Sequence, residues 1–270
     1  MSTLTGWLSN ILGETWLAML SPHDLAPSGK EGRLDPWKED LLQTFQSIEC
    51  ERQVLAMASE MARKLEFDYC AYGLRMPLPL ARPKTALFSN YPAVWQARYQ
   101  AQEYQAIDPT VRHAMRSPSP VVWSDDLFAP ARELWEEARS FGLRAGLAHT
   151  CRDAGGMGGM LTLARAGETV TTAEWQAKAC HILWLVQAVH LSMIRVIAPK
   201  LQPEIAVQLS RREVEVLRWT GEGKTSGEIA NILNITERTV NFHISKAMAK
   251  LNAVNKTAAV LQAAMLGLLS

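Results

Sequence analysis

The spacing of apolar residues predicts strands mixed with helices before residue 198. Alternating apolar and polar positions predict strands at 67–75, 84–90, 146–153 and 157–166. Recurrence every three or four residues predicts helices at 39–65, about 92–104, 131–140 and over about 25 residues from Thr172. Because few helix-sized crossovers separate the strand pairs, we expect an α/β (α+β) sandwich: a largely antiparallel sheet with helices on its faces.

From residue 210 onward the pattern is helical, and it predicts a small all-α domain of four helices. Ser210 and Glu213 form a capping box at the start of the first helix, and Thr225 with Glu228 repeats the device at the second. Thr236 is a good N-cap for a third helix, about three residues after the second ends. Two helices joined this closely have the length and order of a helix-turn-helix.

These patterns divide the chain into four parts. Residues 38–197 form the α/β domain, 198–209 are a linker with two prolines, and 210–270 are the helical domain. Residues 1–37 are an extension in which apolar residues recur at helical spacing: Trp7, Leu8, Ile11, Leu12 and Trp16. We expect an amphipathic helix that packs on the domain or on a partner. Its polar face has no Lys or Arg, which disfavours a membrane surface.

Composition favours a globular protein of the cytoplasm. The 270 residues are 48% hydrophobic and 20% charged. No apolar run approaches the roughly 20 residues of a membrane span, and the N-terminus does not have the pattern of a signal peptide. The four cysteines form no C-x-x-C pair, so we expect free thiols and no metal site at Cys50, Cys70, Cys151 and Cys180.

The charge is distributed unevenly. From residue 205 onward there are eight Lys or Arg and five Asp or Glu, whereas residues 1–204 contain 20 basic and 22 acidic residues. The small positive excess has the sign expected of a domain that meets a polyanion.

The tripeptide Gly223-Lys224-Thr225 resembles the end of a nucleotide-binding loop. That loop is G-x-x-x-x-G-K-[ST], and its early glycine lets backbone N–H groups converge on phosphate. The corresponding position is Arg218, and a helix rather than a buried strand precedes it. The glycines therefore end that helix. A G-x-S-x-G elbow and a metal-spaced His/Asp cluster are also absent from the sequence, so we predict no enzyme activity and no catalytic residue.

The third predicted helix of the C-terminal domain has two different faces. Its apolar stripe, which should face the core, is Val240, Ile244, Ala247, Met248 and Leu251. The opposite face has side chains that can pair with base edges or touch a thymine methyl in the major groove: Arg238, Asn241, Phe242, Ser245 and Lys246. Thr239, Lys224 and the adjacent Thr225 are better placed for DNA phosphate. The alternative is an ordinary solvated face, against which an exposed Phe counts.

A last helix from about Lys256 is apolar nearly all round. Its apolar residues are Ala258, Ala259, Leu261, Ala264, Met265 and Leu268. Packing within one small domain covers only part of such a helix. We therefore expect a twofold partner, that is, a homodimer.

The C-terminal segment LSRREVEVLRWTGEGKTSGEIANILNITERTVNFHISKAMAKLNAVNKTAA resembles the helix-turn-helix domain of LuxR/FixJ-type regulators. The matching positions are Glu213, Leu217, Gly223, Lys224, Glu228, Ile229, Ala230, Leu233, Thr239, Val240, His243 and Leu251. This resemblance implies binding of double-stranded DNA. It leaves open the signal that controls the domain.

Residues 38–200 resemble the autoinducer-binding domain of LuxR-type quorum-sensing regulators, chiefly over FDYCAYGLRMPLPLARPKTALFSNYPAVWQARYQAQEYQAIDPTVRHAM and VVWSDDLF. The family binds N-acyl-homoserine lactones in a sheet-backed cavity. The resemblance implies that Trp95 donates to the lactone carbonyl and that Asp108 accepts the ligand's amide N–H. Tyr91 would hydrogen-bond the amide carbonyl, and the Thr162 hydroxyl would reach the same region.

Four further residues complete the implied ligand set. Trp123 and Phe128 would pack on the lactone ring, with Tyr99 and Val111 nearby. Each polar or aromatic position also has a structural interpretation. Asp108 before a proline is a good helix N-cap, and the aromatic residues suit a core. Two departures bear on specificity: Gln96 stands where some members have a basic residue that reaches a 3-oxo group, and Thr162 stands where the family often has Ser.

The sequence thus predicts a cytoplasmic quorum-sensing transcription factor without a cofactor. It would bind an acyl-homoserine lactone and, as a homodimer, inverted-repeat promoter DNA, with RNA polymerase as a candidate further partner. The nearest alternative is a regulator of the same architecture that folds without lactone or takes a different small ligand. A phosphorylation-driven response regulator fits less well, because residues 38–200 lack the regular strand–helix alternation of a receiver domain.

Overall fold

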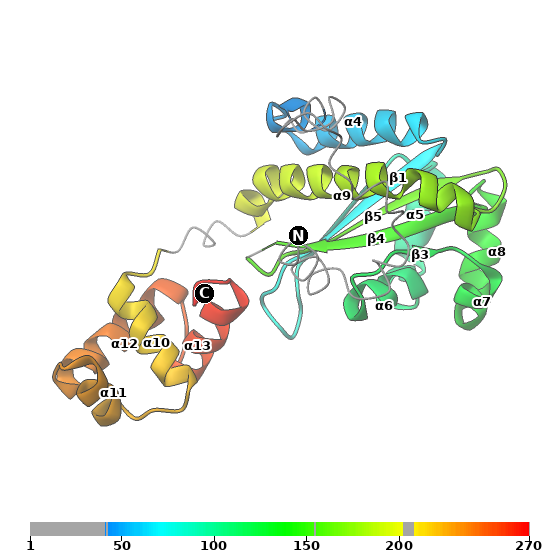
Figure 1. Ribbon diagram of the computed structural model, residues 1–270. Coiled ribbons are helices and arrows are strands. Elements are labelled where there is room, and N and C mark those ends of the chain that lie inside the picture. The colour runs from blue at the N-terminus through cyan, green and yellow to red at the C-terminus, as the bar shows by residue number, and fades with distance from the viewer. Residues whose placement is uncertain (1–40, 42, 154, 202–207, 270) are drawn as a thin grey trace. The chain divides into compact units, whose positions relative to one another are not determined.

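The computed structural model describes residues 41, 43–153, 155–201 and 208–269 (Figure 1). In these residues the chain divides into two compact units, one built on a β-sheet and one that contains the C-terminal helices. The extension predicted at 1–37 and the middle of the predicted linker lie outside the described residues.

In the described residues five strands form one antiparallel sheet in the order β2-β1-β5-β4-β3. The strands are β1 (Tyr69–Arg75), β2 (Thr85–Ser89), β3 (Val121–Val122), β4 (Ala145–Arg152) and β5 (Gly158–Arg165). The four strands predicted from alternation are confirmed. The two-residue β3 is too short for alternation to reveal. It pairs Val121 with Ala148 and Val122 with Leu147.

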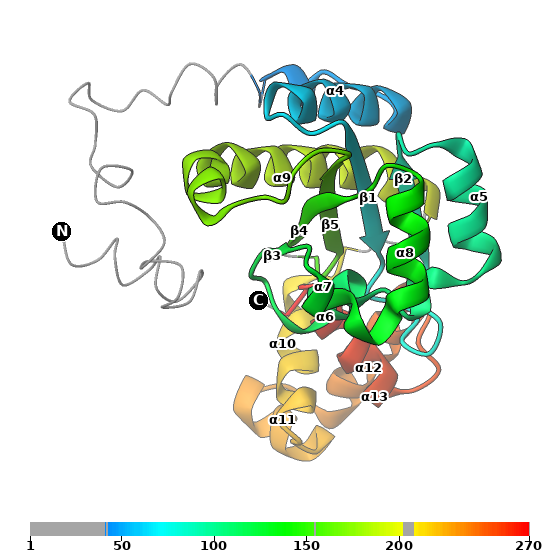
Figure 2. The same cartoon turned by 90° about the vertical axis from the view of Figure 1, so that its right-hand side faces the viewer.

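Helices cover both faces of the sheet, as predicted (Figures 1 and 2). One layer is formed by α4 (Glu51–Lys64) and α9 (Thr172–Leu201). The other contains α5 (Ala93–Ala101), α6 (Pro109–Arg116), α7 (Asp125–Phe128) and α8 (Arg132–Ser140), with short 3-10 turns at Tyr104–Ala106 and Ala129–Ala131.

Strand β1 shows how the two faces are divided. On one face the Tyr72 hydroxyl lies 2.7 Å from Nδ1 of His190 in α9, and both residues are buried. Cys70, on the same face, contacts Ser59 of α4 at 3.3 Å. The intervening residues point the other way because side chains alternate along a strand. Tyr69 accordingly packs among the aromatic residues of the α5–α8 layer.

Two predicted boundaries differ from the structure. The single helix predicted at 39–65 is interrupted at 47–50, where the Ser47 hydroxyl donates to the Thr44 carbonyl at 2.8 Å and Cys50 is extended. α4 then begins at Glu51. At the other end of the domain, α9 continues through Pro199 to Leu201, into the segment predicted as linker.

The expectation that no segment is long and apolar enough to span a membrane is wrong for α9. By length and composition α9 is such a helix, because interspersed polar residues do not lower its average hydropathy enough to exclude it. In the structure 61% of its most apolar window is buried. Its Ser192 hydroxyl donates to the Phe45 carbonyl at 3.1 Å. α9 is therefore a core helix of this domain.

A buried histidine in β4 should make stability pH-dependent. Burial lowers the pKa of His149 to about 4, and its Nδ1 lies 2.7 Å from the Thr150 carbonyl oxygen. The unfolded chain takes up this proton near pH 6.5, whereas the folded domain resists it until about pH 4. The free energy of unfolding should therefore fall by about 3 kcal/mol as pH falls through that window.

Urea unfolding at pH 7.5 and pH 5 measures this effect. In His149→Gln the difference between the two pH values should shrink, because the variant has no imidazole to protonate. An unchanged pH dependence in His149→Gln would show that other groups cause the loss of stability in acid.

The C-terminal unit contains the predicted four helices: α10 (Arg211–Gly221), α11 (Ser226–Leu233), α12 (Glu237–Leu251) and α13 (Lys256–Met265). Both predicted capping boxes are present, and the Thr236 hydroxyl accepts from the N–H of Thr239 at 3.1 Å. Asn234 is left-handed at φ 52° and ends α11. Such a turn aims the next helix at a fixed angle, which is what a helix-turn-helix requires.

The domain's core forms from the predicted apolar stripe of α12. Val240, Ile244, Ala247 and Leu251 are all buried. On α13 the domain buries Ala259 and Ala263, whereas Leu261 keeps 44% of its surface exposed. Packing within the domain thus covers one side of α13.

Candidate functional site

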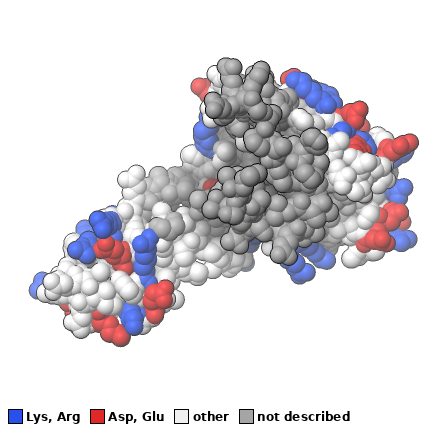
Figure 3. Space-filling view, viewed as in Figure 1, with Lys and Arg blue, Asp and Glu red and all other residues white. Residues whose placement is uncertain are grey.

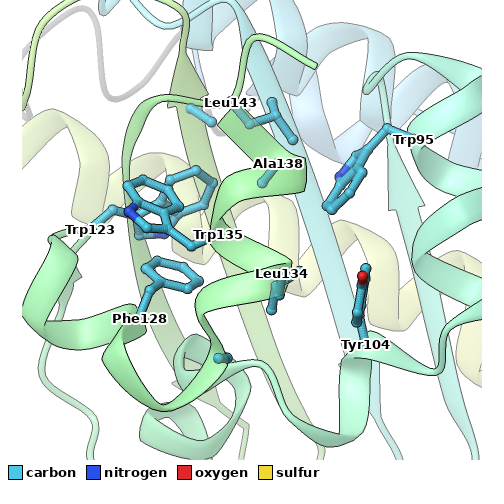
Figure 4. Packing of buried hydrophobic residues seen from close by; sticks show 10 residues of the cluster. Trp95, Tyr104, Trp123, Phe128, Leu134, Trp135, Ala138 and Leu143 are labelled. Carbon is cyan, nitrogen blue, oxygen red and sulfur yellow. The ribbon is translucent and has the colours of Figure 1, made fainter. Parts of the chain in front are cut away.

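An aromatic cluster lies between the sheet and the α5–α8 layer (Figure 4). Trp95 of α5 is 2% exposed, and its ring centroid lies 5.9 Å from Tyr99, 6.0 Å from Tyr104 and 5.4 Å from Phe141. In Figure 4 Trp95 and Tyr104 lie together, apart from the group formed by Trp123, Phe128 and Trp135. The cluster therefore has two aromatic walls from different segments of the chain.

The second wall is held in place by ring packing. Phe128 and Trp135 stack at 4.5 Å, and Trp123 stands edge-on to both, at 5.8 and 5.9 Å. The Trp135 indole N–H donates to Asp125 Oδ1 at 2.6 Å. This wall is thus anchored at the surface by a hydrogen bond and inside by aromatic contacts.

A carboxylate joins the first wall. Asp108 Oδ1 accepts from the backbone N–H and the hydroxyl of Thr110, at 2.8 and 2.6 Å, and its Oδ2 accepts from the Tyr99 hydroxyl at 2.9 Å. The helix N-cap interpretation of Asp108 is therefore confirmed. The same carboxylate lies one hydrogen bond away from an aromatic residue of the cluster, so the cap is compatible with a second role.

The polar groups of this site are strongly desolvated. Burial raises the pKa of Asp108, although hydrogen bonds from Thr110 and Tyr99 oppose the shift. Burial also raises the pKa values of Tyr91 and Tyr99, and the charge of Asp108 adds to both shifts. The two phenols stay protonated and can donate. All three side chains are half-buried in the domain.

Mostly small residues form the floor of the site on the sheet. Side-chain alternation places Ala71, Gly73, Gly146, Ala148, Met160, Thr162 and Ala164 on this face. A Cβ on Gly146 would come within 2.6 Å of the Leu163 carbonyl oxygen and 3.0 Å of the Trp123 ring, so the indole lies directly on the strand. A Cβ on Gly73 would meet nothing within 4 Å. The floor is thus covered at the aromatic end and open toward Gly73.

The structure brings most of the predicted ligand residues together. Trp95, Trp123 and Phe128 belong to one cluster, and Tyr91 and Tyr99 pack against it. Asp108 joins through Tyr99, as described above. Thr162 is 5% exposed and lies two residues from Ala164 of the cluster, and Val111 is half-buried on α6 next to Thr110.

Sequence reasoning missed part of the site. Tyr104, Trp135, Phe141 and the α8 residues Leu134 and Ala138 belong to the same cluster. The signal available was the helical spacing of Leu134, Trp135 and Ala138, which marks a buried helix face but not what it faces.

Helix α12 presents the predicted DNA-reading face. Phe242 is 55% exposed, and Arg238, Asn241, Ser245 and Lys246 are exposed beside it. The Lys246 ammonium lies 5.7 Å from the Phe242 ring, a cation–π contact. Asn241 Oδ1 accepts from the Ser226 hydroxyl at 2.8 Å, which fixes α12 against the start of α11.

The predicted phosphate-contacting residues lie at helix N-termini. Thr225 caps α11, Thr239 lies in the first turn of α12, and the Lys224 ammonium lies 3.9 Å from Glu228. Figure 3 shows Lys and Arg interspersed with Asp and Glu over this domain rather than in one continuous patch on the face shown.

No metal centre is evident in the part of the chain that the structure describes. No three His, Cys, Asp or Glu side chains gather there in a metal-binding group, and all four cysteines are free thiols.

Comparisons with known proteins agree on both domains. Residues 51–193 match the family described as "Autoinducer binding domain", and 207–263 match "Bacterial regulatory proteins, luxR family". The chain is 46% identical over 238 residues to the transcriptional activator protein AnoR of Acinetobacter nosocomialis, which covers 87% of this chain and 100% of that protein. It is 40% identical to the HTH-type quorum-sensing regulator RhlR of Pseudomonas aeruginosa, over 86% of this chain and 96% of the other.

Solved structures show the same architecture. The crystal structure of Escherichia coli SdiA aligns with a TM-score of 0.74 at 38% identity, covering 87% of this chain and 98% of that one. SdiA in complex with octanoyl-rac-glycerol aligns with a TM-score of 0.73 at 37% identity, and the alignment covers 88% of this chain and 98% of that one.

Proposed function

The chain belongs to the LuxR family of autoinducer-responsive transcription factors, and from this membership we propose that its ligand is an N-acyl-homoserine lactone, held between the two aromatic walls. One observation carries the proposal: the Asp108 carboxylate, whose pKa burial raises, accepts a hydrogen bond from Tyr99, which packs against the aromatic cluster. A mostly apolar site with a few placed polar groups is the usual form of a small-molecule site.

The polar groups match the head of such a ligand. Its amide N–H needs an acceptor, which Asp108 supplies. Its amide carbonyl and lactone carbonyl need donors, which Tyr91 and the indole of Trp95 supply, and the Thr162 hydroxyl lies on the same sheet face. Each pairing is needed, because a buried amide or carbonyl without a partner costs about 1–3 kcal/mol. Phe128 and Trp123 pack on the lactone ring, and Tyr99 holds Asp108 in place.

The acyl tail runs along the small-residue floor toward Gly73. From Tyr69, beside the aromatic cluster, four residues of β1 span about 13 Å at the usual rise of a strand. Gly73 has open space where a side chain would stand. Val111, half-buried on α6, would border this path from the helical layer.

Gly73→Leu should therefore shorten the preferred acyl tail. The Cβ of the new side chain would meet nothing within 4 Å, and the rest of the side chain would occupy the far end of the path. We expect affinity for the longest tails to fall at least about tenfold, since each displaced CH2 forfeits about 0.8 kcal/mol of burial, while short tails bind as before. Titration with lactones of graded tail length measures this. An unchanged length profile in folded Gly73→Leu would place the tail elsewhere.

The C-terminal domain reads DNA as one half of a homodimer. Ligand binding completes the core of the N-terminal domain and favours pairing, and two α12 helices then meet inverted half-sites about one DNA turn apart. Leu261 on α13 is an exposed apolar residue that a second copy would cover. The protein acts in the cytoplasm, where RNA polymerase is a further partner at promoters.

Substitutions on α12 should separate base reading from phosphate contact. With an operator selected from random sequence, Phe242→Ala should weaken binding about fourfold at a site that contains thymine, because a methyl group is worth about 0.8 kcal/mol. Replacing that thymine by uracil should weaken the wild-type chain equally and leave Phe242→Ala unaffected.

The matched control for this experiment is Lys224→Ala. It should weaken binding to all DNA sequences alike. It should also reduce the slope of log K against log salt concentration by about one, as loss of one phosphate contact does. Insensitivity of the wild-type chain to the uracil replacement would remove Phe242 from the base-reading set.

A second ligand class is suggested by the related SdiA structure with octanoyl-rac-glycerol. A monoacylglycerol has the same long tail, and its hydroxyls can donate to Asp108 and accept from the indole of Trp95. Competition of 1-octanoylglycerol with a bound lactone tests this class. Stabilisation by the glycerol ester alone would favour a regulator whose fold does not depend on lactone.

A further inference from the structure

The indole N–H of Trp123 is buried without a protein partner. The residue is 7% exposed, and its Nε1 has no hydrogen-bond partner among the residues that the structure describes. The neighbouring Trp135 differs, because its N–H donates to Asp125 Oδ1 at 2.6 Å. Folded proteins seldom leave such a donor unpaired, since its desolvation is then uncompensated. The indole N–H of Trp123 can therefore donate a hydrogen bond to a molecule in the site, whose walls are aromatic rings.

The surroundings of Trp123 prevent its ring from turning to find a partner. Its backbone N–H donates to the Gly146 carbonyl at 2.8 Å, which fixes the residue beside β4. The indole lies on Gly146, and the rings of Phe128 and Trp135 stand edge-on to it. Because the ring is clamped on these sides, a molecule that enters the site is placed to supply its acceptor.

We propose that Trp123 is a specificity-determining donor, whose indole N–H hydrogen-bonds an ester oxygen of the ligand's ring. This inference rests on the proposed function, in which the lactone ring lies at the aromatic end of the floor. Trp95 supplies one donor to the lactone, and Trp123 supplies a second. The carbonyl and the ring oxygen together offer enough lone pairs for both donors.

The consequence is discrimination between rings by chemistry rather than by shape. A ligand with a cyclopentyl ring in place of the lactone has nearly the same outline but no ester oxygen. With that ligand both indole N–H groups stay unpaired, and a site built around a hydrogen bond rejects the analogue that lacks the partner. Packing alone, in contrast, would treat the two rings almost equally.

The test measures dissociation constants for two ligands on full-length variants. The ligands are an N-acyl-homoserine lactone and the N-acyl cyclopentylamide with the same tail. Trp123→Phe keeps an aromatic ring and removes the N–H. We expect the wild-type preference for lactone over cyclopentylamide to shrink about five- to tenfold in Trp123→Phe, the usual value of one hydrogen bond. Loss of ring area affects both ligands and cancels in this ratio.

Trp135→Phe is the matched control. It removes an indole N–H that is already paired with Asp125, so it should leave the preference ratio unchanged even where it weakens both ligands. If Trp123→Phe does not fold, 3-benzothienylalanine at position 123 keeps the bicyclic shape with sulfur in place of N–H. It should shrink the ratio by the same factor.

Two outcomes overturn the inference and are distinguishable. Equal loss for both ligands in the Trp123 variants would mean that the residue acts by packing alone, with the proposed ligand class intact. Failure of the wild-type chain to bind either ligand would overturn the ligand class together with the inference.

Discussion

Asp108→Asn is expected to weaken the response to acyl-homoserine lactone strongly while the domain stays folded. Asparagine is as good an N-cap as aspartate, so α6 keeps its bond from the Thr110 N–H. What is lost is the charged acceptor for the ligand's amide. A hydrogen bond to a charged group is worth about 1.5–3 kcal/mol, so affinity should fall about 10- to 150-fold. Titration of the purified variant with lactone, and a promoter reporter in cells, measure the loss.

Asp125→Asn is the matched control for this change. Asp125 is a carboxylate at a helix start that accepts from the indole of Trp135, and 80% of its side chain is exposed. Its amide replacement retains an acceptor for that indole and touches no proposed ligand group, so the lactone response should be that of the wild-type chain. Wild-type affinity in Asp108→Asn would remove Asp108 from the ligand site and leave it as a helix cap only.

Gly146→Ala is expected to destabilise the N-terminal domain and to damage the ligand site together. The added methyl would lie 2.6 Å from the Leu163 carbonyl oxygen, which is backbone and cannot move aside cheaply. It would also press on the Trp123 indole at 3.0 Å. Overpacking of this kind costs about 1–3 kcal/mol, which in a domain of this size lowers the melting temperature by roughly 2–12 °C. Calorimetry of the chain measures the shift.

Gly73→Ala provides the comparison on the same face of the same sheet. A Cβ there meets nothing within 4 Å, and alanine in a strand costs less chain entropy than glycine. The melting temperature should be unchanged or slightly raised. Equal destabilisation by the two substitutions would mean that glycine matters in this sheet for its backbone freedom, not for the close approach of Trp123.

Local rules predicted much of this structure from the sequence. The capping boxes at Ser210 and Thr225 and the apolar stripe of α12 depend on residues within one or two turns of each other. The strand alternation of β1 and of the β4–β5 pair is equally local. These predictions are confirmed because neighbouring residues alone decide such local structure.

Features that depend on distant residues could not be predicted. β3 is a strand only because β4, more than twenty residues later, pairs with it. Trp135 lies in the site because α8 packs on the sheet. The spacing of apolar residues in α8 does not specify what the helix packs against. For Asp108 the sequence allowed a helix cap or a ligand contact, and the structure shows that the cap lies beside the aromatic cluster.

The melting temperature of the full chain against acyl-homoserine lactones of graded tail length tests the ligand assignment most directly. A ligand at a hundredfold excess over its dissociation constant stabilises the folded state by about 2.7 kcal/mol, which should raise the midpoint by several degrees. We predict a rise that peaks at one tail length and is much smaller in Asp108→Asn. No rise with any lactone, in wild-type protein that already binds DNA, would contradict the proposed ligand class.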